Sequence, residues 1–217
     1  MAPWVRRKEV RATEILDAAL KVFVDRGYHA TRLEDVGAAA GVTKGTIYLY
    51  FRNKESLFTQ VVQSTIEPFL TEAEETLAGH AGSAAELLDG LSKQYWEKLG
   101  RDKMALISRL MQVEGANFPE LSNFYVEKVL YRGRRLVTQI LQYGVARGEF
   151  HPVDPLCFSE ALFAIIELAS TQAYGFRSHD PARADSTALV HVGVELLVRG
   201  VLVDPAAWRP RSLPAGD

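Results

Sequence analysis

Apolar residues recur at helical spacing along most of the 217-residue chain, and no stretch carries the signals of a β-hairpin. The first apolar face, on a helix predicted over residues 9–26, is formed by Ile15, Leu16, Ala19, Val22 and Phe23. Gly27 is placed to end that helix. The pattern predicts an all-α fold.

The residues from Thr31 to Lys54 predict two short helices joined by a tight turn. Thr31 and Glu34 have the spacing of a capping box, which would begin the first helix. Gly41 is placed to supply the left-handed residue that ends it, and Thr43 is the predicted N-cap of the second helix.

The second helix should have an outward surface that is polar and aromatic, because its apolar side is taken by Ile47 and Phe51. The stretch from Thr43 to Phe51 contains no acidic residue. A helix in the major groove needs small residues, hydroxyls and a cation, and few acids, whereas an ordinary helical hairpin more often exposes Glu and Lys. We therefore predict a DNA-binding surface formed by Thr43, Lys44, Gly45, Thr46, Tyr48 and Tyr50. The bases would be read mainly by Lys44, Gly45 and Thr46. Thr31 and Lys54 are predicted to hold phosphates from helix N-termini.

At these positions the sequence resembles the TetR family of one-component bacterial regulators. The matching residues are Thr31, Leu33, Val36, Ala40-Gly41-Val42, Gly45-Thr46-Ile47-Tyr48, Tyr50-Phe51, Lys54 and Leu57, preceded by Ile15-Leu16-Asp17-Ala18-Ala19, Phe23 and Gly27-Tyr28. The match is tight over roughly the first sixty residues and only architectural beyond Leu57. Gly37 departs from the family pattern, which more often has Ala, and so predicts a close contact. The resemblance implies a homodimer built on a four-helix interface and ligands held between a long spanning helix and the helices that follow it.

Asn53 is the predicted N-cap of a helix over about residues 54–79, which at 1.5 Å per residue is roughly 35 to 40 Å long and could span two domains. Further helices are predicted over residues 83–99, 102–116, 119–147, 154–178 and 186–202. We expect a helix-turn-helix domain over residues 1–56, with a flexible basic arm at 1–8, and a helical effector-binding and dimerisation domain over 57–217.

The last two predicted helices are apolar nearly all round, each with one narrow polar strip. Such helices bury two faces, one in the chain's own core and one against a partner; a fully internal helix pair is the alternative. The candidates for the core of an isologous dimer are Leu162, Ile166, Ala169, Val190, Val194 and Leu197.

Charge is distributed unevenly although the whole chain is nearly balanced at -2. Residues 1–56 hold 10 Lys and Arg against 7 Asp and Glu, and the remainder holds 15 against 20. A net-positive N-terminal part is typical of a segment that faces phosphate. The single Cys157 lies in an apolar run and is predicted to be core. Neither a signal peptide nor a membrane span is seen, so a cytoplasmic protein without membrane partners is expected.

The sequence lacks the groups of residues that catalysis requires. The five histidines are scattered, and His191 with Glu195 has the spacing of a surface polar pair. The glycines between Gly37 and Thr46 do not have phosphate-loop spacing. We predict no enzyme, no metal site and no cofactor.

The leading hypothesis is a transcriptional regulator, most simply a repressor, that leaves a near-palindromic operator when a small apolar or aromatic effector binds. Eight residues of the second domain suit an adaptable apolar cavity, although each alone is better read as core: Phe69, Trp96, Met104, Met111, Phe124, Tyr125, Phe158 and Phe163. The alternatives are a constitutive DNA-binding protein and an all-α enzyme or carrier.

Overall fold

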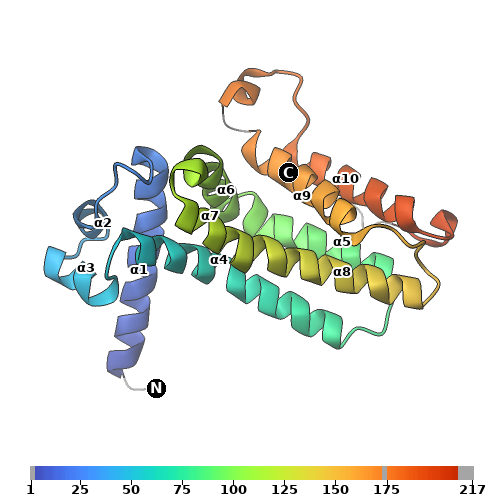
Figure 1. The fold of residues 1–217 in the computed structure, drawn as a ribbon, viewed down its shortest axis with the longest axis horizontal. Coiled ribbons are helices and arrows are strands. Elements are labelled where there is room, and N and C mark those ends of the chain that lie inside the picture. The colour runs from blue at the N-terminus through green and yellow to red at the C-terminus, as the bar shows by residue number, and fades with distance from the viewer. Residues whose placement is uncertain (1–2, 173–174, 210–217) are drawn as a thin grey trace. The chain divides into compact units, whose positions relative to one another are not determined.

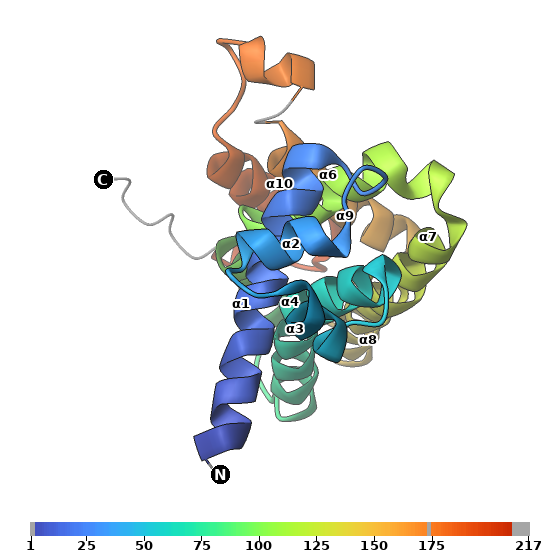
Figure 2. The same cartoon turned by 90° about the vertical axis from the view of Figure 1, so that its left-hand side faces the viewer.

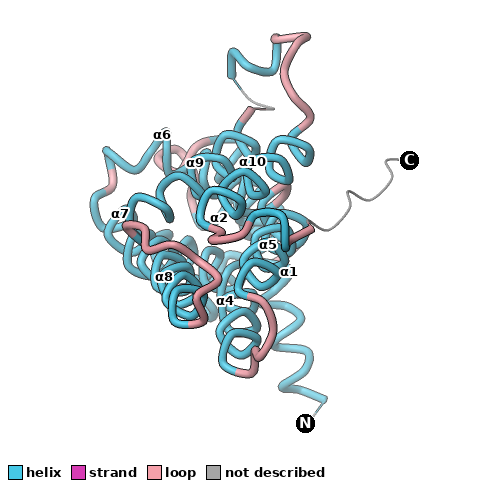
Figure 3. Tube along the Cα trace, turned by 90° about the vertical axis from the view of Figure 1, so that its right-hand side faces the viewer, coloured by secondary structure: helices cyan, strands magenta, loops and turns pink. Residues whose placement is uncertain are grey.

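The computed structural model describes residues 3–172 and 175–209, and the side chains of residues 3–10, 175–176 and 207 lie outside this description. The fold is all-α, as predicted, and the described residues contain no strand beyond an isolated bridge between Phe150 and Leu202 (Figures 1 and 3). The helices are α1 (Pro3–Arg26), α2 (Leu33–Ala39), α3 (Lys44–Tyr50), α4 (Lys54–Ala78), α5 (Ala84–Tyr95), α6 (Lys103–Glu114), α7 (Pro119–Tyr125), α8 (Tyr131–Ala146), α9 (Pro155–Thr171) and α10 (Ser186–Val201).

The chain divides into two compact units, but not at the predicted boundary after residue 56. Unit 1 comprises Met1–Ile66 and Leu106–Lys128, and unit 2 comprises Glu67–Ala105 and Val129–Asp217. The helix-turn-helix therefore shares a unit with most of α6 and with α7. The physical reason is aromatic packing inside unit 1, where the rings of Tyr28 and Phe118 meet edge to face with centroids 4.7 Å apart.

The core of unit 1 is built from the apolar faces that the periodicity indicates. Ile15 and Phe23 of α1, Val36 of α2 and Ile47 of α3 are fully buried. Phe58 of α4 joins them, with its ring centroid 5.8 Å from that of Phe23. This core holds α2 and α3 against α1 and α4, and other buried apolar side chains such as Leu33 and Leu57 complete it.

Unit 2 is a helical bundle in which α5 packs on α8 and α10, and α9 packs on α8 and α10. The N-terminus of α5 is closed by a carboxylate from the segment after α8. Glu149 accepts hydrogen bonds from the amides of Ala84 and Ala85, at 2.8 and 2.9 Å, and from the hydroxyl of Ser83. A carboxylate at a helix N-terminus accepts hydrogen bonds from free amides and interacts favourably with the positive end of the helix dipole. Glu149 therefore links the segment after α8 to the start of α5.

Most predicted helix ends are confirmed. Gly27, Gly41 and Gly148 have positive φ angles of 80°, 65° and 68°. Thr43 and Asp154 cap α3 and α9 through their side chains.

Four local predictions are wrong. The capping box of α2 is formed one residue later than expected, because the amide of Arg32 donates to Asp35 at 3.0 Å. Residues 3–8 are helical and continue α1, so the arm is not a separate segment. A π turn at Val126–Leu130 interrupts the long helix predicted over residues 119–147. The helix predicted to reach residue 178 ends at Thr171.

Candidate functional site

A short turn joins α2 to α3, and the two helices pack on each other (Figure 2). Thr43 accepts a hydrogen bond from the amide of Thr46 at 3.2 Å, and the two hydroxyls are 2.9 Å apart. Ile47 is fully buried and anchors the helix. A Cβ on Gly37 would lie 3.4 Å from the carbonyl oxygen of Val42, which is an ordinary van der Waals distance, so the close contact expected at this glycine is not found.

The outward side of α3 includes a residue that we did not predict. At roughly 100° per residue, Gly45 and Leu49 are the positions most nearly opposite Ile47. Leu49 is 81% exposed, the largest exposure among the large apolar side chains that the structure describes. The helical spacing from Ile47 indicates this position, but a leucine lacks the polar groups that are typical of DNA contacts.

The predicted contacts Lys44 and Tyr48 meet a carboxylate from α2. The ammonium of Lys44 lies 2.8 Å from Oε1 of Glu34, and the hydroxyl of Tyr48 donates to the same oxygen at 3.3 Å. The bond with Lys44 holds the pKa of Glu34 below its usual range and raises the pKa of Lys44. The acid-free sequence of α3 therefore does not give an acid-free surface, because α2 supplies the charge.

Two residues predicted to hold phosphates have internal roles in the described structure. Thr31 is only 2% exposed, and its hydroxyl donates to the carbonyl oxygen of Gly27 at 2.8 Å. The ammonium of Lys54 donates to the carbonyl oxygens of Tyr28 and His29 at 2.6 and 2.9 Å. Partial burial lowers the pKa of Lys54. Both side chains close the C-terminal end of α1, where carbonyl groups have no helical partners.

The turn between α6 and α7 is attached to the same end of α1. Besides the ring of Phe118 on Tyr28, Oε1 of Glu114 accepts a hydrogen bond from the amide of His29 at 3.4 Å. Burial, followed by the charges of Glu55 and Glu120, raises the pKa of Tyr28 to about 12. A change in the position of this turn would therefore alter the contacts of Tyr28 and His29, which lie between α1 and α2.

The eight predicted effector residues are divided between the two units. Met111, Phe124 and Tyr125 belong to unit 1, and the other five belong to unit 2. Phe69, Trp96, Met104 and Phe158 are buried. Trp96 also donates through its indole N–H to the hydroxyl of Thr187 at 3.1 Å, so it is part of the structural core.

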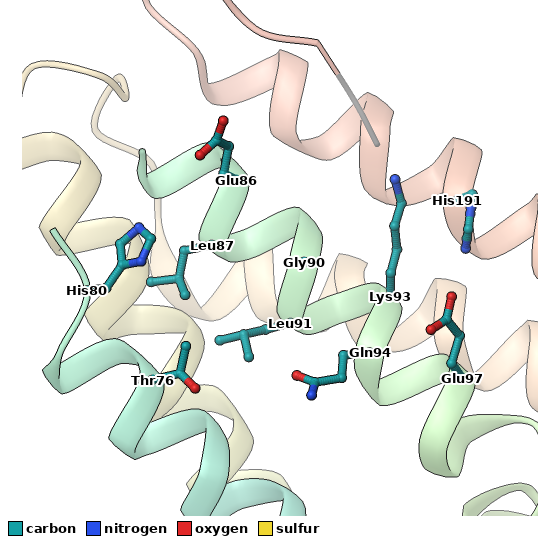
Figure 4. Close-up of a pocket in the computed structure, with 10 residues that line it drawn as sticks. All are labelled: Thr76, His80, Glu86, Leu87, Gly90, Leu91, Lys93, Gln94, Glu97 and His191. Atoms are coloured by element: carbon teal, nitrogen blue, oxygen red, sulfur yellow. The ribbon is translucent and has the colours of Figure 1, made fainter. Parts of the chain in front are cut away.

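Unit 2 contains a pocket of about 450 Å³ that none of these eight residues lines (Figure 4). Most of its lining comes from α5, with Lys93 pointing toward α10, where His191 lies. Polar and charged groups outnumber apolar ones among the lining residues, which are Thr76, His80, Glu86, Leu87, Gly90, Leu91, Lys93, Gln94, Glu97 and His191. Its character differs from the apolar cavity that we expected.

His191 is not the surface residue that its spacing with Glu195 suggested. It is 5% exposed, and neither ring nitrogen has a hydrogen-bond partner. Burial, followed by the charge of Lys93, lowers its pKa. Within residues 3–172 and 175–209, no group of three potential metal ligands is found. Cys157, predicted to be core, is exposed.

The predicted dimer residues are placed mostly inside the chain. Leu162, Ala169, Val190 and Val194 are buried within unit 2, so their side chains are unavailable to a partner, and only Ile166 and Leu197 are partly exposed. These positions face the chain's own core, because α9 packs on α8 and α10, and α10 packs on α5 and α9. The apolar side chains that α9, α10 and the following segment do expose are Leu156, Val192, Leu196 and Val203.

An all-α chain with a helix-turn-helix and an exposed second helix defines a DNA-binding regulator of transcription. The model of the bacterial regulatory proteins of the tetR family matches residues 15–61, and that of the AefR-like transcriptional repressor C-terminal domain matches residues 86–199. The chain belongs to the TetR family, and it is a ligand-responsive DNA-binding repressor, not an enzyme.

Similar proteins include regulators of lipid metabolism. The fatty acid metabolism regulator protein of Bacillus subtilis is 27% identical over 199 residues, which are 91% of this chain and 98% of that protein. The repressor KstR2 of Mycolicibacterium smegmatis is 30% identical over 143 residues, 65% of this chain and 68% of that protein. The structure of FadR from Bacillus subtilis in complex with stearoyl-CoA is 27% identical, with a TM-score of 0.71, and the match covers 87% of this chain and 98% of that chain.

Proposed function

We propose that this repressor binds a near-palindromic operator as a homodimer and leaves it when an acyl-chain effector binds. The observation that carries the DNA-binding part is the exposed face of α3, where Lys44, Gly45, Thr46 and Leu49 are available around a buried Ile47. Base edges would be read by these residues together with Tyr48. A repressor of this kind acts on chromosomal DNA, which places it in the cytoplasm.

The dimer would use the exposed apolar side chains of α9 and α10. Val192 and Leu196 lie one helical turn apart on α10, and both are more than half exposed. Apolar surface of this kind on two neighbouring helices is typical of an interface with a second copy. Two-fold symmetry would place the two α3 helices about 34 Å apart, on successive major grooves.

Acyl compounds are the effector class that the relatives support best. One related structure contains stearoyl-CoA, and a related protein regulates fatty acid metabolism. The predicted apolar effector agrees with an acyl chain. The residues that contact it stay a prediction.

Release would act through the turn between α6 and α7. This turn contacts the end of α1 through Phe118 and Glu114, inside the unit that also contains α3. An effector that favours a different position of the turn would shift the population toward a helix-turn-helix with lower operator affinity. The size of the effect is limited to the difference in effector affinity between the two states.

The test measures binding of the full-length protein to an operator selected from random DNA, by fluorescence anisotropy, with acyl-CoA thioesters of increasing chain length. We expect long-chain thioesters to weaken binding by about tenfold or more, and coenzyme A alone to have no effect. Lys44→Ala should weaken operator binding in the absence of any effector. If no thioester changes affinity, the repressor does not respond to acyl chains, and if Lys44→Ala and Tyr48→Ala both bind normally, α3 is not the reading helix.

A further inference from the structure

A carboxylate within the proposed DNA-binding surface needs an explanation. Glu34 forms what we call the Glu34 cluster with Lys44 and Tyr48, and all three side chains are at least partly exposed. The surface of DNA is densely negative, and attraction of Lys and Arg to phosphates supplies most sequence-independent affinity. An acid here therefore weakens binding to every sequence unless a specific contact compensates.

The ion pair also changes what Lys44 can do. A lysine without a partner is attracted to any phosphate within reach, whereas the ammonium of Lys44 lies 2.8 Å from a carboxylate oxygen. The pair has almost no net charge for a distant phosphate. Breaking it to contact a phosphate would leave the carboxylate facing the DNA alone. The Glu34 cluster thus lowers the sequence-independent attraction of this surface to DNA phosphates at the place where base contacts are expected.

The same pair offers a donor and an acceptor side by side. In the major groove, a G·C base pair presents the acceptor O6 of guanine next to the amino donor of cytosine, one hydrogen-bond length away. An ammonium has three donors and a carboxylate accepts several hydrogen bonds. Lys44 and Glu34 can therefore contact this base pair without losing each other, and guanine N7 gives Lys44 a second acceptor.

We propose that Glu34 is a specificity-determining residue: with Lys44 it reads one G·C base pair in each half-site, and it lowers affinity for DNA that lacks this pair. The proposal rests on α3 being the reading helix. It assigns to α2 a role in base recognition that the sequence of α3 alone does not contain.

The test compares Glu34→Gln with wild type on the selected operator and on a duplex of the same composition in scrambled order, over a range of salt concentrations. We expect tighter binding to the scrambled duplex and a specificity ratio lowered by about tenfold. Selection with the variant should lose the G·C preference at one position per half-site. Asp25→Asn removes one charge at an exposed position of α1 and should change binding to both duplexes by the same factor.

A uniform shift for Glu34→Gln, equal to that of Asp25→Asn, or an unchanged selected sequence, would overturn the proposal. Thermal unfolding of each variant separates loss of fold from loss of specificity. If Lys44→Ala and Tyr48→Ala both leave binding to the two duplexes unchanged, the reading helix itself is wrongly assigned. If Lys44→Ala weakens operator binding but Glu34→Gln leaves the specificity ratio intact, only the role of Glu34 fails.

Discussion

Leu49 illustrates how one exposed side chain is explained by its position on a helix. An 81% exposed leucine loses the favourable burial that an apolar side chain usually gains. In the major groove, the C5-methyl group of thymine is an apolar partner for such a residue. A Cβ on the neighbouring Gly45 would lie 3.9 Å from Oγ1 of Thr43, and the absence of a side chain at this exposed position leaves room for close approach to DNA.

We predict that Leu49→Ala weakens operator binding by about 1 to 2 kcal/mol, because three carbons lose an apolar contact. The stability of the free protein should hardly change, since the side chain is exposed there. Binding curves and thermal unfolding of the variant check both parts. Selection from random DNA should show a weaker thymine preference at one position, and normal operator affinity would exclude Leu49 from the interface.

His191 gives a prediction about acid stability. Burial lowers its pKa in the folded chain from a value of 6.5, so below that pH the unfolded chain binds more protons. The stability that its neutral form contributes is complete above pH 6.5 and is lost as pH falls through the lowered pKa. Lys93 opposes protonation, whereas Glu97, Asp89 and Asp185 favour it.

Urea unfolding of wild type should therefore show decreasing stability from about pH 6.5 downward. His191→Leu should flatten the curve in this window, while a further loss at lower pH persists, because the pKa of Glu149 is also lowered by its bonds to Ser83 and two amides. His151→Gln, at an exposed position, is the control. Identical pH profiles for wild type and His191→Leu would contradict the prediction.

At the scale of elements, the sequence predicts helix type and end signals well. Gly27, Gly41 and Gly148 mark ends because their left-handed backbone is costly for other residues, and this is visible from residue type alone. The capping partner of α2 was missed because Thr31 and Asp35 each offer a plausible cap. Tertiary contacts decide between them: the hydroxyl of Thr31 binds the end of α1, and Asp35 also pairs with Arg26 at 2.8 Å.

The junction after α8 gives the clearest packing prediction. A Cβ on Gly144 would lie 2.1 Å from the ring of Phe150, which is buried and whose amide donates to the carbonyl oxygen of Gly144. We expect Gly144→Ala to destabilise the protein by about 1 to 3 kcal/mol. Gly37→Ala is the matched control: its nearest contact is 3.4 Å, so improved helix propensity should leave stability unchanged or raised by up to about 1 kcal/mol.

Chemical denaturation of the two variants checks this difference. Equal stability of Gly144→Ala and wild type would mean that Phe150 moves without cost. A strongly destabilised Gly37→Ala would show that α2 and the following turn cannot accept a methyl group.

At the scale of the whole molecule, periodicity identified helices with apolar residues on several sides but not which side faces outward. Val190 and Val194 were predicted to face a dimer partner, but both are buried in unit 2. In a helix that is apolar all round, the sequence does not indicate which side faces the chain's own core, and here α5 and α9 pack on α10. The eight effector residues stay a prediction, because they are divided between the two units. The sequence gives no indication that residues 106–128 belong with the DNA-binding unit.

We predict that Leu196→Glu converts the dimer to a monomer at micromolar concentration, because a charge would be buried in an apolar interface. Light scattering measures the mass. Val113→Glu, an equally exposed apolar position on α6, should leave the dimer intact. A wild-type monomer, or a Leu196→Glu dimer, would show that this face is not the interface.

The ring of Phe118 on Tyr28 has a consequence for the modular use of this protein. To join the DNA-binding segment of this repressor to the effector domain of another, the sequence alone would suggest transferring residues 1–56. Such a graft would leave Tyr28 without Phe118 and His29 without Glu114, and it would divide α4. A graft that keeps residues 106–128 together with the helix-turn-helix preserves these contacts. The segments that must be transferred are therefore not contiguous in the sequence.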